Sequence, residues 1–453
     1  MIEVRFVDGT LELRGDAPPE LVPPAFRFDR RTGCLRAPAA AYAEVALALH
    51  RAGVPFEDRA RRWQRTPWPL AQSRTPRPYQ TEALQAWQSA GRQGVVVLPT
   101  GAGKSWVAVL CIADAARPTL VVAPTLDMVR QWHDLLQQAF GCEVGVVGGG
   151  EHTVLPLTVT TYDSAWAHMR HLGARFGLVV FDEVHHLPGA SYAAAAEMAM
   201  APFRLGLTAT PERTDGGESR YDALVGPLVH RAEIVEMSGQ WLADYDTDRI
   251  VVEMDEDERA DYELCREHYR GFVRAAGIRL GEPGGFARFL RLAGTSVEGR
   301  EALAAYRRQR RLALSSRAKL RLLGALLDRH KDDPTIVFTD DNATAHGIAL
   351  AFLLPVITHQ TKVRERSSIL GGLRAGRFGA VVTSRVLNEG VDVPEASVAI
   401  VVSGSGTVRE HVQRLGRVLR KAEGKRAKLY ELVSAETSET FTSDRRRDHV
   451  AYR

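Results

Sequence analysis

The sequence predicts an α/β protein with two parallel-sheet domains, a small N-terminal α+β domain and a helical insertion. Two observations lead to this prediction. Short apolar, β-branched runs alternate with helical segments in two separate series, which is the pattern of parallel strands buried under helices on both faces. Between the two series, at about residues 255–312, the sequence is charged and helical with scattered aromatic residues. A chain of 453 residues, 45% of them hydrophobic, is long enough to bury more than one core.

The N-terminal domain is predicted over residues 1–62. "MIEVRFVDGTLELRG" alternates as a strand does, and "APAAAYAEVALALHRAG" predicts a helix that ends at Gly53. The first residues lack the apolar block of a signal peptide. A Pro-rich, basic connector, "RTPWPLAQSRTPRP", separates this domain from the first series of strands.

The remaining boundaries follow from where the strand–helix pattern starts and stops. We expect the first α/β domain at 63–240, a linker and the helical insertion at 241–314, and the second α/β domain at 315–453. The strands expected in the first are "GVVVLP", "TLVVAP", "LTVTTY", "FGLVVFDE" and "FRLGLTAT". Those expected in the second are "PTIVFT", "LPVITH", "FGAVVTS", "VAIVVSG" and "AKLYELVS". The final "SDRRRDHVAYR" is expected to be a frayed, basic end.

Bulk composition argues against several classes of protein. No apolar run approaches the ~18 residues that a membrane-spanning helix needs, so we expect no contact with a membrane. The four cysteines lie far apart without a C-x-x-C, which disfavours a zinc site or a disulfide framework and fits a reducing cytoplasm. Residues 300–331 hold ten Lys or Arg against two acids, and 409–428 hold eight against two. Such runs suit a phosphate backbone, with solvated helix faces as the equally weighted alternative.

A phosphate-binding loop is predicted at "LPTGAGKS", which follows the first strand and precedes a helix. Leu98 stands where the strict P-loop motif has glycine, so the match is to the looser G-x-G-K-[ST] form. Backbone N–H groups of such a turn wrap phosphate oxygens, Lys104 adds charge, and the hydroxyl of Ser105 can bind Mg²⁺. The nucleotide-binding residues expected here are Thr100, Gly101, Ala102, Gly103, Lys104 and Ser105.

Two carboxylates, Asp182 and Glu183, end the hydrophobic strand "VVFDEVHH". One carboxylate near Mg²⁺ and one free to orient or deprotonate water are the minimum for hydrolysing a phosphoanhydride. Taken alone, a solvated acidic pair is equally acceptable. A metal site built from His185 and His186 is disfavoured, because adjacent residues on a helix diverge by about 100°.

"QRLGRVLR", residues 413–420, places its basic residues on one face. In a helix, Gln413, Arg417 and Arg420 fall together at i, i+4 and i+7, opposite an apolar face. We therefore expect an anion opposite these side chains.

With these segments in this order, the chain resembles the superfamily 2 helicases, which clamp ATP between two RecA-like domains. The resemblance covers almost the whole chain. It rests on "RPYQ" (77–80, the Q motif), "LPTGAGKS" (motif I), "APT" (123–125, Ia), "TTYDS" (160–164, strand contact), "DEVH" (182–185, II), "TAT" (208–210, III), "VFT" (IV), "SRVLNEGVDVPEA" (V) and "QRLGRVLR" (VI).

The resemblance implies roles for residues outside the P-loop. Arg77 and Gln80 would contact the adenine. Arg417 and Arg420 would act as arginine fingers and Gln413 would lie by the attacking water or the γ-phosphate, so these three join Lys104, Asp182 and Glu183 as catalytic residues. Asp392 would lie near the ribose or the fingers, and Ser105 and Asp182 would hold Mg²⁺. The DNA-backbone donors would be Thr125, Thr161, Thr383 and Ser384.

Within this superfamily the chain looks like the XPB branch, in its archaeal or bacterial form. "FDEVHHLP", "APFRLGLTATPER", "NEGVDVPEA" and "SGSGTVREHVQRLGRVLR" carry this closer likeness. It implies a damage-recognition-like N-terminal domain, a thumb-like helical insertion, 3′–5′ translocation, and strand separation in excision repair. It also implies a cytoplasmic, nucleoid-associated location and a nuclease partner.

One departure concerns the strand-separating triplet of the family, Arg-Glu-Asp. Here Arg213, Thr214 and Asp215 stand at that position, so a hydroxyl replaces the central carboxylate. The expected activity is therefore an ATP-dependent DNA helicase acting on single-stranded or forked DNA. The alternative is a duplex DNA translocase that remodels protein–DNA complexes without unwinding. An RNA helicase and a silent nucleic-acid clamp are less favoured. A silent clamp has no chemical need for all four of Lys104, Asp182, Glu183 and Arg420.

Overall fold

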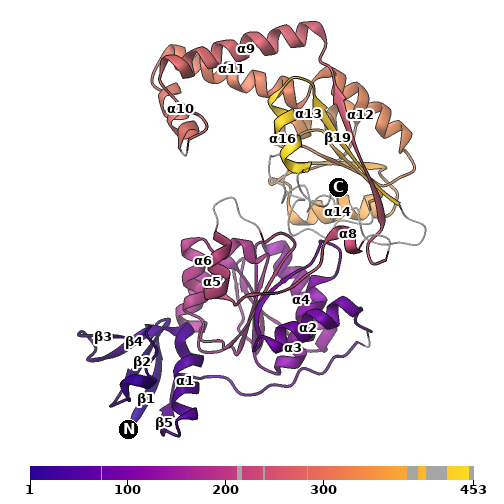
Figure 1. The fold of residues 1–453 in the computed structure, drawn as a ribbon. Coiled ribbons are helices and arrows are strands. Elements are labelled where there is room, and N and C mark those ends of the chain that lie inside the picture. Colours follow the sequence, from indigo (N-terminus) through magenta and orange to yellow (C-terminus); the bar gives the residue numbers. More distant parts are fainter. Residues whose placement is uncertain are drawn as a thin grey trace. The chain divides into compact units, whose positions relative to one another are not determined.

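The computed structural model describes residues 1–72, 74–211, 217–237, 240–282, 284–384, 396–404 and 426–447. The chain divides into two compact units, Met1–Glu236 and Met237–Arg453, each with its own hydrophobic cores. The elements of each unit are drawn in Figure 1.

The N-terminal domain is a five-stranded sheet with one helix against it. Its strands are β1 (Ile2–Val7), β2 (Thr10–Arg14), β3 (Arg27–Asp29), β4 (Cys34–Pro38) and β5 (Phe56–Asp58), in the order β3-β4-β2-β1-β5. The helix is α1 (Tyr42–Arg51), and short 3₁₀ turns lie at Pro19–Leu21 and Ala39–Ala41. β1 and β2 form a hairpin through Asp8 and Gly9, whose φ angles of 44° and 79° are both left-handed. That geometry matches the twist of the two strands, which is why a short Asp-Gly turn closes them.

The N-terminal domain shares its core with the first α/β domain. Trp63, Ala174 and Met200 belong to the same buried cluster as the residues of β1, β2 and α1. The backbone N–H of Arg62 donates to the carbonyl oxygen of Ala174 at 3.1 Å. A Cβ on Gly9 would lie 2.5 Å from Cγ of Met198, so any larger residue there would displace the Met198 side chain. The two parts of the first unit are therefore held together by burial.

The first α/β domain is an eight-stranded sheet in the order β13-β6-β12-β11-β7-β10-β8-β9. Its strands are β6 (Gln93–Val97), β7 (Thr119–Ala123), β8 (Gly145–Gly148), β9 (Glu151–His152), β10 (Leu157–Thr161), β11 (Leu178–Asp182), β12 (Phe203–Thr208) and β13 (Leu228–Arg231). All pairings are parallel except that of β8 with β9. The five central strands are buried on both faces, which explains their continuous apolar runs.

Helices cover both faces of this sheet. α2 (Pro78–Ser89), α3 (Lys104–Ala115) and α4 (Leu126–Phe140) lie on one face, and α5 (Tyr162–Leu172) and α6 (Ala190–Glu197) lie on the other (Figure 1). Shorter segments complete the domain: Val184–His186, Gly217–Arg220, α7 (Tyr221–Leu224) and α8 (Ile234–Met237).

The second unit contains a parallel sheet in the order β14-β19-β18-β15-β17-β16. Its strands are β14 (Asp244–Val252), β15 (Thr335–Phe338), β16 (Val356–Ile357), β17 (Ala380–Thr383), β18 (Val398–Val401) and β19 (Arg426–Ser434). Its helices are α12 (Arg317–Arg329), α13 (Asn342–Phe352), α14 (Val363–Arg374) and α16 (Ser438–Arg447). β14 lies in the range assigned from the sequence to the linker and insertion, and it pairs with β19 along its whole length.

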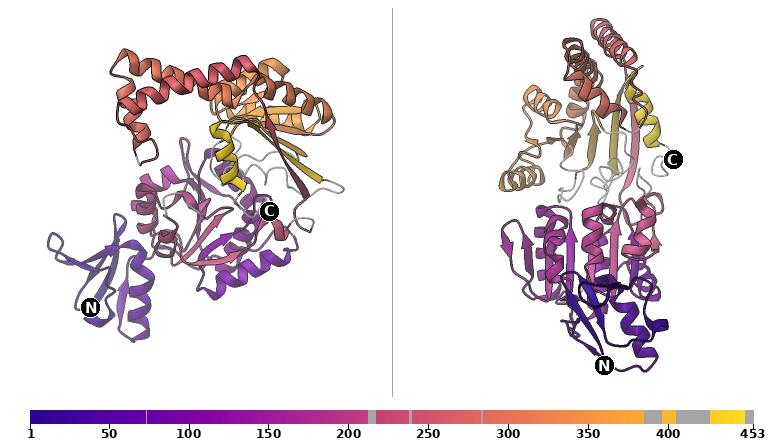
Figure 2. Two further views of the ribbon diagram at one scale, coloured as in Figure 1. Left: turned by 45° about the horizontal axis from the view of Figure 1, so that its top comes forward. Right: turned by 90° about the vertical axis from the view of Figure 1, so that its left-hand side faces the viewer.

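The helical insertion consists of α9 (Glu256–Ala275), α10 (Gly285–Ala293) and α11 (Val297–Leu314). α9 and α11 run side by side, with α10 at their far end (Figures 1 and 2). Its aromatic residues form a core of their own, in which Tyr269 and Phe289 are buried and their rings lie 5.7 Å apart. Most of these aromatics therefore pack against one another, and Phe286 is the exposed one among them.

The tail differs from the sequence prediction. Helix α16 continues to Arg447, although "SDRRR" was expected to fray. Ser443 is buried, and Glu439 forms an ion pair with the fully buried Lys319 of α12. A buried charge is tolerated only when paired, so this contact fixes the helix against its sheet.

Candidate functional site

The candidate site lies at the carboxyl ends of β6 and β11, where open parallel sheets bind ligands. The P-loop follows β6 and runs directly into α3, so the first N–H groups of that helix are available to an anion. Gly101 and Gly103 have φ angles of +88° and +81°, which side chains other than glycine rarely adopt. The sequence-predicted turn is therefore present, in the conformation that exposes backbone N–H groups.

Helix α2 holds the P-loop from behind. The hydroxyl of Tyr79 donates to the carbonyl oxygen of Ala102 at 2.6 Å. The side-chain amide of Gln80 donates to the carbonyl oxygens of Ala102 at 3.4 Å and Gly103 at 3.3 Å, and Gln80 is only 1% exposed. The side-chain oxygen of Gln80, Oε1, accepts from the backbone N–H of Arg77 at 3.0 Å. Tyr79 was not singled out in the sequence, and contact of Arg77 and Gln80 with adenine stays a prediction.

Lys104 and Glu183 face each other across the site. Nζ of Lys104 lies 3.9 Å from Oε1 of Glu183, and both side chains are largely buried. Glu183 has a φ of +46°, the left-handed conformation, which costs a non-glycine residue ~1–2 kcal/mol. Such strain at a polar, buried position is characteristic of functional sites.

Asp182 is held by two donors. Its Oδ2 accepts from the indole N–H of Trp132 at 2.7 Å, and its Oδ1 accepts from the backbone N–H of Glu183 at 3.0 Å. Burial, together with the neighbouring charge of Glu183, raises the pKa of Asp182 to about 6, against the lowering effect of Trp132 and Lys104. Trp132 was not predicted, because nothing in the spacing of α4 distinguishes it from an ordinary core residue.

His185 is hydrogen-bonded to the end of β12 and lies close to Glu183 of the acidic pair. Nδ1 of His185 lies 3.2 Å from Oγ1 of Thr208 and 3.5 Å from Oε2 of Glu183. Oγ1 of Thr208 in turn accepts from the backbone N–H of Thr210 at 3.1 Å. "DEVH" and "TAT" therefore form one polar network, in which His185 links the two motifs.

The candidate ligands fit a Mg²⁺ ion that would also contact the phosphates of a bound nucleotide. The candidate ligands Ser105 and Asp182 supply oxygen atoms, which Mg²⁺ prefers, and it usually completes its shell with water and substrate phosphates. The buried side-chain oxygens Oγ1 of Thr100, Oγ1 of Thr210 and Oε2 of Glu183 have no hydrogen-bond partner among the described residues. In the same part of the chain, no cluster of three or more His, Cys, Asp or Glu side chains could hold a metal ion by itself.

The three threonines and one serine that are expected to contact DNA lie at the ends of strands or just beyond them. Thr125 caps α4 and Thr161 caps α5, accepting from backbone N–H groups at 3.3 Å and 3.1 Å. Thr383 and Ser384, at the end of β17, are buried, and the hydroxyl of Thr383 donates to the carbonyl oxygen of Ser384. Helix capping and burial account for these positions, and their contact with DNA stays a prediction.

Several predicted site residues lie outside the described residues. They are the strand-separating triplet Arg213, Thr214 and Asp215, the motif V residue Asp392, and the motif VI residues Gln413, Arg417 and Arg420.

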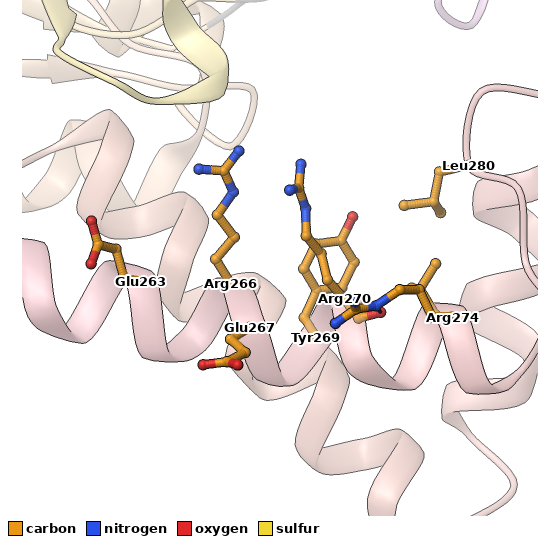
Figure 3. Close-up of a pocket in the computed structure, with 8 residues that line it drawn as sticks. Glu263, Arg266, Glu267, Tyr269, Arg270, Arg274 and Leu280 are labelled. Carbon is orange, nitrogen blue, oxygen red and sulfur yellow. Dashed lines mark hydrogen bonds between the residues drawn. The ribbon is translucent and has the colours of Figure 1, made fainter.

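The insertion carries a basic face near its tip. A pocket of about 740 Å³ is lined by Arg266, Tyr269, Arg270 and Arg274 of α9 and by Leu280, which follows that helix. Arg266 and Arg270 project to the same side of α9 (Figure 3). Glu263 and Glu267 line the same pocket, so the face is mixed rather than purely cationic.

Comparison with known families assigns three parts of the chain. Residues 4–60 match the family described as "Xeroderma pigmentosum group B helicase damage recognition domain". Residues 73–213 match "Type III restriction enzyme, res subunit", and residues 300–452 match "ERCC3/RAD25/XPB C-terminal helicase".

Curated relatives extend this likeness along the chain. The chain is 41% identical over 383 residues to the DNA 3′–5′ translocase XPB2 of Sulfurisphaera tokodaii, covering 84% of this chain and 87% of that protein. It is 32% identical over 391 residues to the DNA 3′–5′ helicase XPB of Kineococcus radiotolerans, covering 83% of this chain but 62% of that protein.

A solved structure supports the fold. The crystal structure of the Pyrococcus furiosus Hef helicase domain matches 82% of this chain and 98% of its own, with a TM-score of 0.56 at 19% identity. Together with the two parallel sheets, this likeness confirms the predicted class of two RecA-like domains with a small N-terminal domain. Among the described residues, no helix is long and apolar enough to cross a membrane.

Proposed function

The chain belongs to the XPB family of superfamily 2 DNA helicases, and on this premise we propose that it is an ATP-dependent DNA motor with 3′–5′ polarity that acts in DNA repair. The observation that carries the proposal is the approach of Lys104 to Glu183 beside the P-loop. A P-loop cation, a carboxylate suited to Mg²⁺ and a second carboxylate are the groups that hydrolysis of a phosphoanhydride needs.

Each residue of the candidate site has a proposed part in hydrolysis. Backbone N–H groups of the P-loop bind the phosphates, and Lys104 neutralises charge on the outer ones. Ser105 and Asp182 would hold Mg²⁺, which when bound withdraws negative charge from the phosphates. Glu183 orients or deprotonates the attacking water, and its Oε2 is suited to this because it has no hydrogen-bond partner among the described residues.

The second α/β domain supplies the remaining groups of the proposed mechanism. Arg417 and Arg420 are the proposed arginine fingers, which stabilise charge in the transition state. Gln413 is proposed to lie near the attacking water or the γ-phosphate, and Asp392 near the ribose or the arginine fingers. These roles rest on the resemblance of "QRLGRVLR" and "SRVLNEGVDVPEA" to motifs VI and V.

The domain roles are proposed on the same basis. Residues 1–62 would recognise damaged DNA, 63–240 would bind the nucleotide, 241–314 would include the DNA-gripping thumb, and 315–453 would complete the motor. We propose that the protein works in the cytoplasm at the nucleoid, where its DNA substrate lies, and that a nuclease acts with it.

The test is steady-state ATP hydrolysis with no nucleic acid, single-stranded DNA, duplex DNA, forked DNA and RNA. Lys104→Ala is the blank. Stimulation by single-stranded or forked DNA supports a strand-separating helicase. No hydrolysis above the blank with any nucleic acid would refute the proposal. Stimulation by RNA alone would mean that the substrate is RNA and not DNA.

A duplex translocase that does not unwind is the second candidate, favoured by Thr214 in the place of a carboxylate. Stimulation of ATP hydrolysis by plain duplex alone would support it. Thr214→Glu should then raise the rate of fork unwinding at unchanged ATP hydrolysis, because it restores the charge that the family uses. An unchanged unwinding rate would show that the missing carboxylate does not limit strand separation.

A further inference from the structure

Trp132, which lies on α4, contacts the carboxylate of Asp182, the candidate Mg²⁺ ligand. Its indole N–H donates to Oδ2 of Asp182 at 2.7 Å, and the two residues are 3% and 4% exposed. Oδ1 of Asp182 already accepts from the backbone N–H of Glu183. Each carboxylate oxygen therefore has one fixed donor, which leaves further lone pairs of both for a metal ion and water.

The donor is rigidly placed, because α4 is fixed at both ends. Thr125 caps its first turn, and the backbone N–H of Ala71 donates to the carbonyl oxygen of Ala139 in its last turn at 2.7 Å. Rotation of the indole away from Asp182 would break a buried, charge-assisted hydrogen bond.

Two other tryptophans of the same domain show what an indole N–H does where its role is structural. Nε1 of Trp68 donates to the backbone carbonyl oxygen of Arg117 at 2.7 Å. Nε1 of Trp87 donates to that of Arg204 at 2.9 Å. Trp132 differs from both, because its acceptor is a carboxylate with a proposed role in binding Mg²⁺.

We propose that Trp132 is a positioning residue for the reaction, whose indole N–H holds the Asp182 carboxylate in the orientation that binds the Mg²⁺ of the nucleotide. The proposal rests on the proposed function. It also gives α4 a defined place in that function. Thr125, which is predicted to contact DNA, caps the start of this helix, and Trp132 lies in its second turn. The alternative is that Trp132 only fills space in the core.

Two substitutions separate the N–H from the volume of the side chain. Trp132→Phe keeps most of the ring volume and removes the donor. Trp132→His removes the outer ring but keeps a five-membered ring whose Nε2 occupies the position of the indole nitrogen. Trp68→Phe is the matched control, since it removes an indole N–H that donates to a backbone carbonyl.

The readout is equilibrium binding of a fluorescent, non-hydrolysable ATP analogue as Mg²⁺ is titrated, at a pH well above the usual imidazole pKa of about 6.5. Trp132→Phe should raise the Mg²⁺ concentration for half-maximal binding about 10-fold to 100-fold, the usual effect of losing a partner of a metal ligand. Trp132→His should return it to within a few-fold of wild type, and Trp68→Phe should leave it unchanged.

Equal Mg²⁺ dependence in Trp132→Phe and Trp68→Phe would overturn the proposal. So would a Trp132→His protein that is impaired as much as Trp132→Phe, since the effect would then follow volume. Should Trp132→Phe fail to fold, Trp132→His decides alone, because a Mg²⁺ requirement raised about 10-fold or more in that variant would overturn the proposal. ATP hydrolysis by wild type is measured alongside, so failure of the proposed function would be seen separately from failure of this inference.

Discussion

Replacement of Gly103 by alanine tests whether the P-loop conformation described above is the one that binds nucleotide. Gly103 has a φ of +81°, where an L-residue costs ~1–2 kcal/mol. A Cβ there would also lie 2.9 Å from Nε2 of Gln80, which must then leave the carbonyl oxygens of Ala102 and Gly103. Those two hydrogen bonds are long, so their loss adds about 1 kcal/mol in all.

The strained loop can relax only by leaving the conformation that exposes its N–H groups. If about 2 kcal/mol of this strain opposes nucleotide binding, the affinity falls about 30-fold. Equilibrium binding of a fluorescent ATP analogue to Gly103→Ala measures this. Gly91→Ala is the control, because Gly91 has a φ of +70° with open space around its Cβ position and lies in the same domain.

Gly91→Ala should lose a similar amount of stability in urea unfolding while it binds nucleotide as wild type does. Affinities of the two variants within about threefold of each other, a difference of about 0.6 kcal/mol, would refute the reasoning. The P-loop would then bind nucleotide in a conformation other than the one described.

Three further predictions concern the chemistry of the site. Glu183→Gln should lower kcat by at least ~10²–10⁴, because it removes the general base. Nucleotide should still bind, since the P-loop is unchanged. A burst assay or steady-state hydrolysis measures the loss, with bound nucleotide measured as the control. Arg420→Ala should likewise keep nucleotide binding and lose ~10³–10⁵ in kcat, and turnover near wild type would contradict the finger assignment. The raised pKa of Asp182, about 6, means that protons compete with Mg²⁺ below that pH. Mg²⁺-dependent nucleotide binding should therefore weaken as pH falls through about 6 and stay constant above about 7, and a flat profile from pH about 5 to 8 in a titration would contradict it.

The parallel sheets could be predicted because their central strands are buried on both faces. Val95–Val97 and Val179–Phe181 carry almost no polar residue, and a continuous apolar run of this length indicates such a strand without knowledge of its neighbours. The P-loop could be predicted for a different reason, since only glycine fits the left-handed turn between β6 and α3. Local chemistry alone specifies both features.

Features that depend on distant partners could not be predicted. β14 reads as a polar linker because it is an edge strand with mostly half-exposed residues, and its partner β19 lies far away in the sequence. Helix α16 contains a run of charges, but its place is decided by Lys319. Trp132 reads as one apolar residue of an amphipathic helix, and only the folded domain brings its N–H to Asp182.

The pairing of β14 with β19 has a mechanical consequence. The nine residues of β14 run parallel to β19 at the edge of the second sheet, and α9 starts four residues after β14 ends. Tension applied to the tip of the insertion and transmitted along α9 would load the hydrogen bonds of this pair together, in shear, rather than peel them apart one by one. A strand pair loaded in this way resists a force equal to the combined strength of its hydrogen bonds. Force on the tip of the insertion would therefore reach the sheet through all the hydrogen bonds of this strand pair at once.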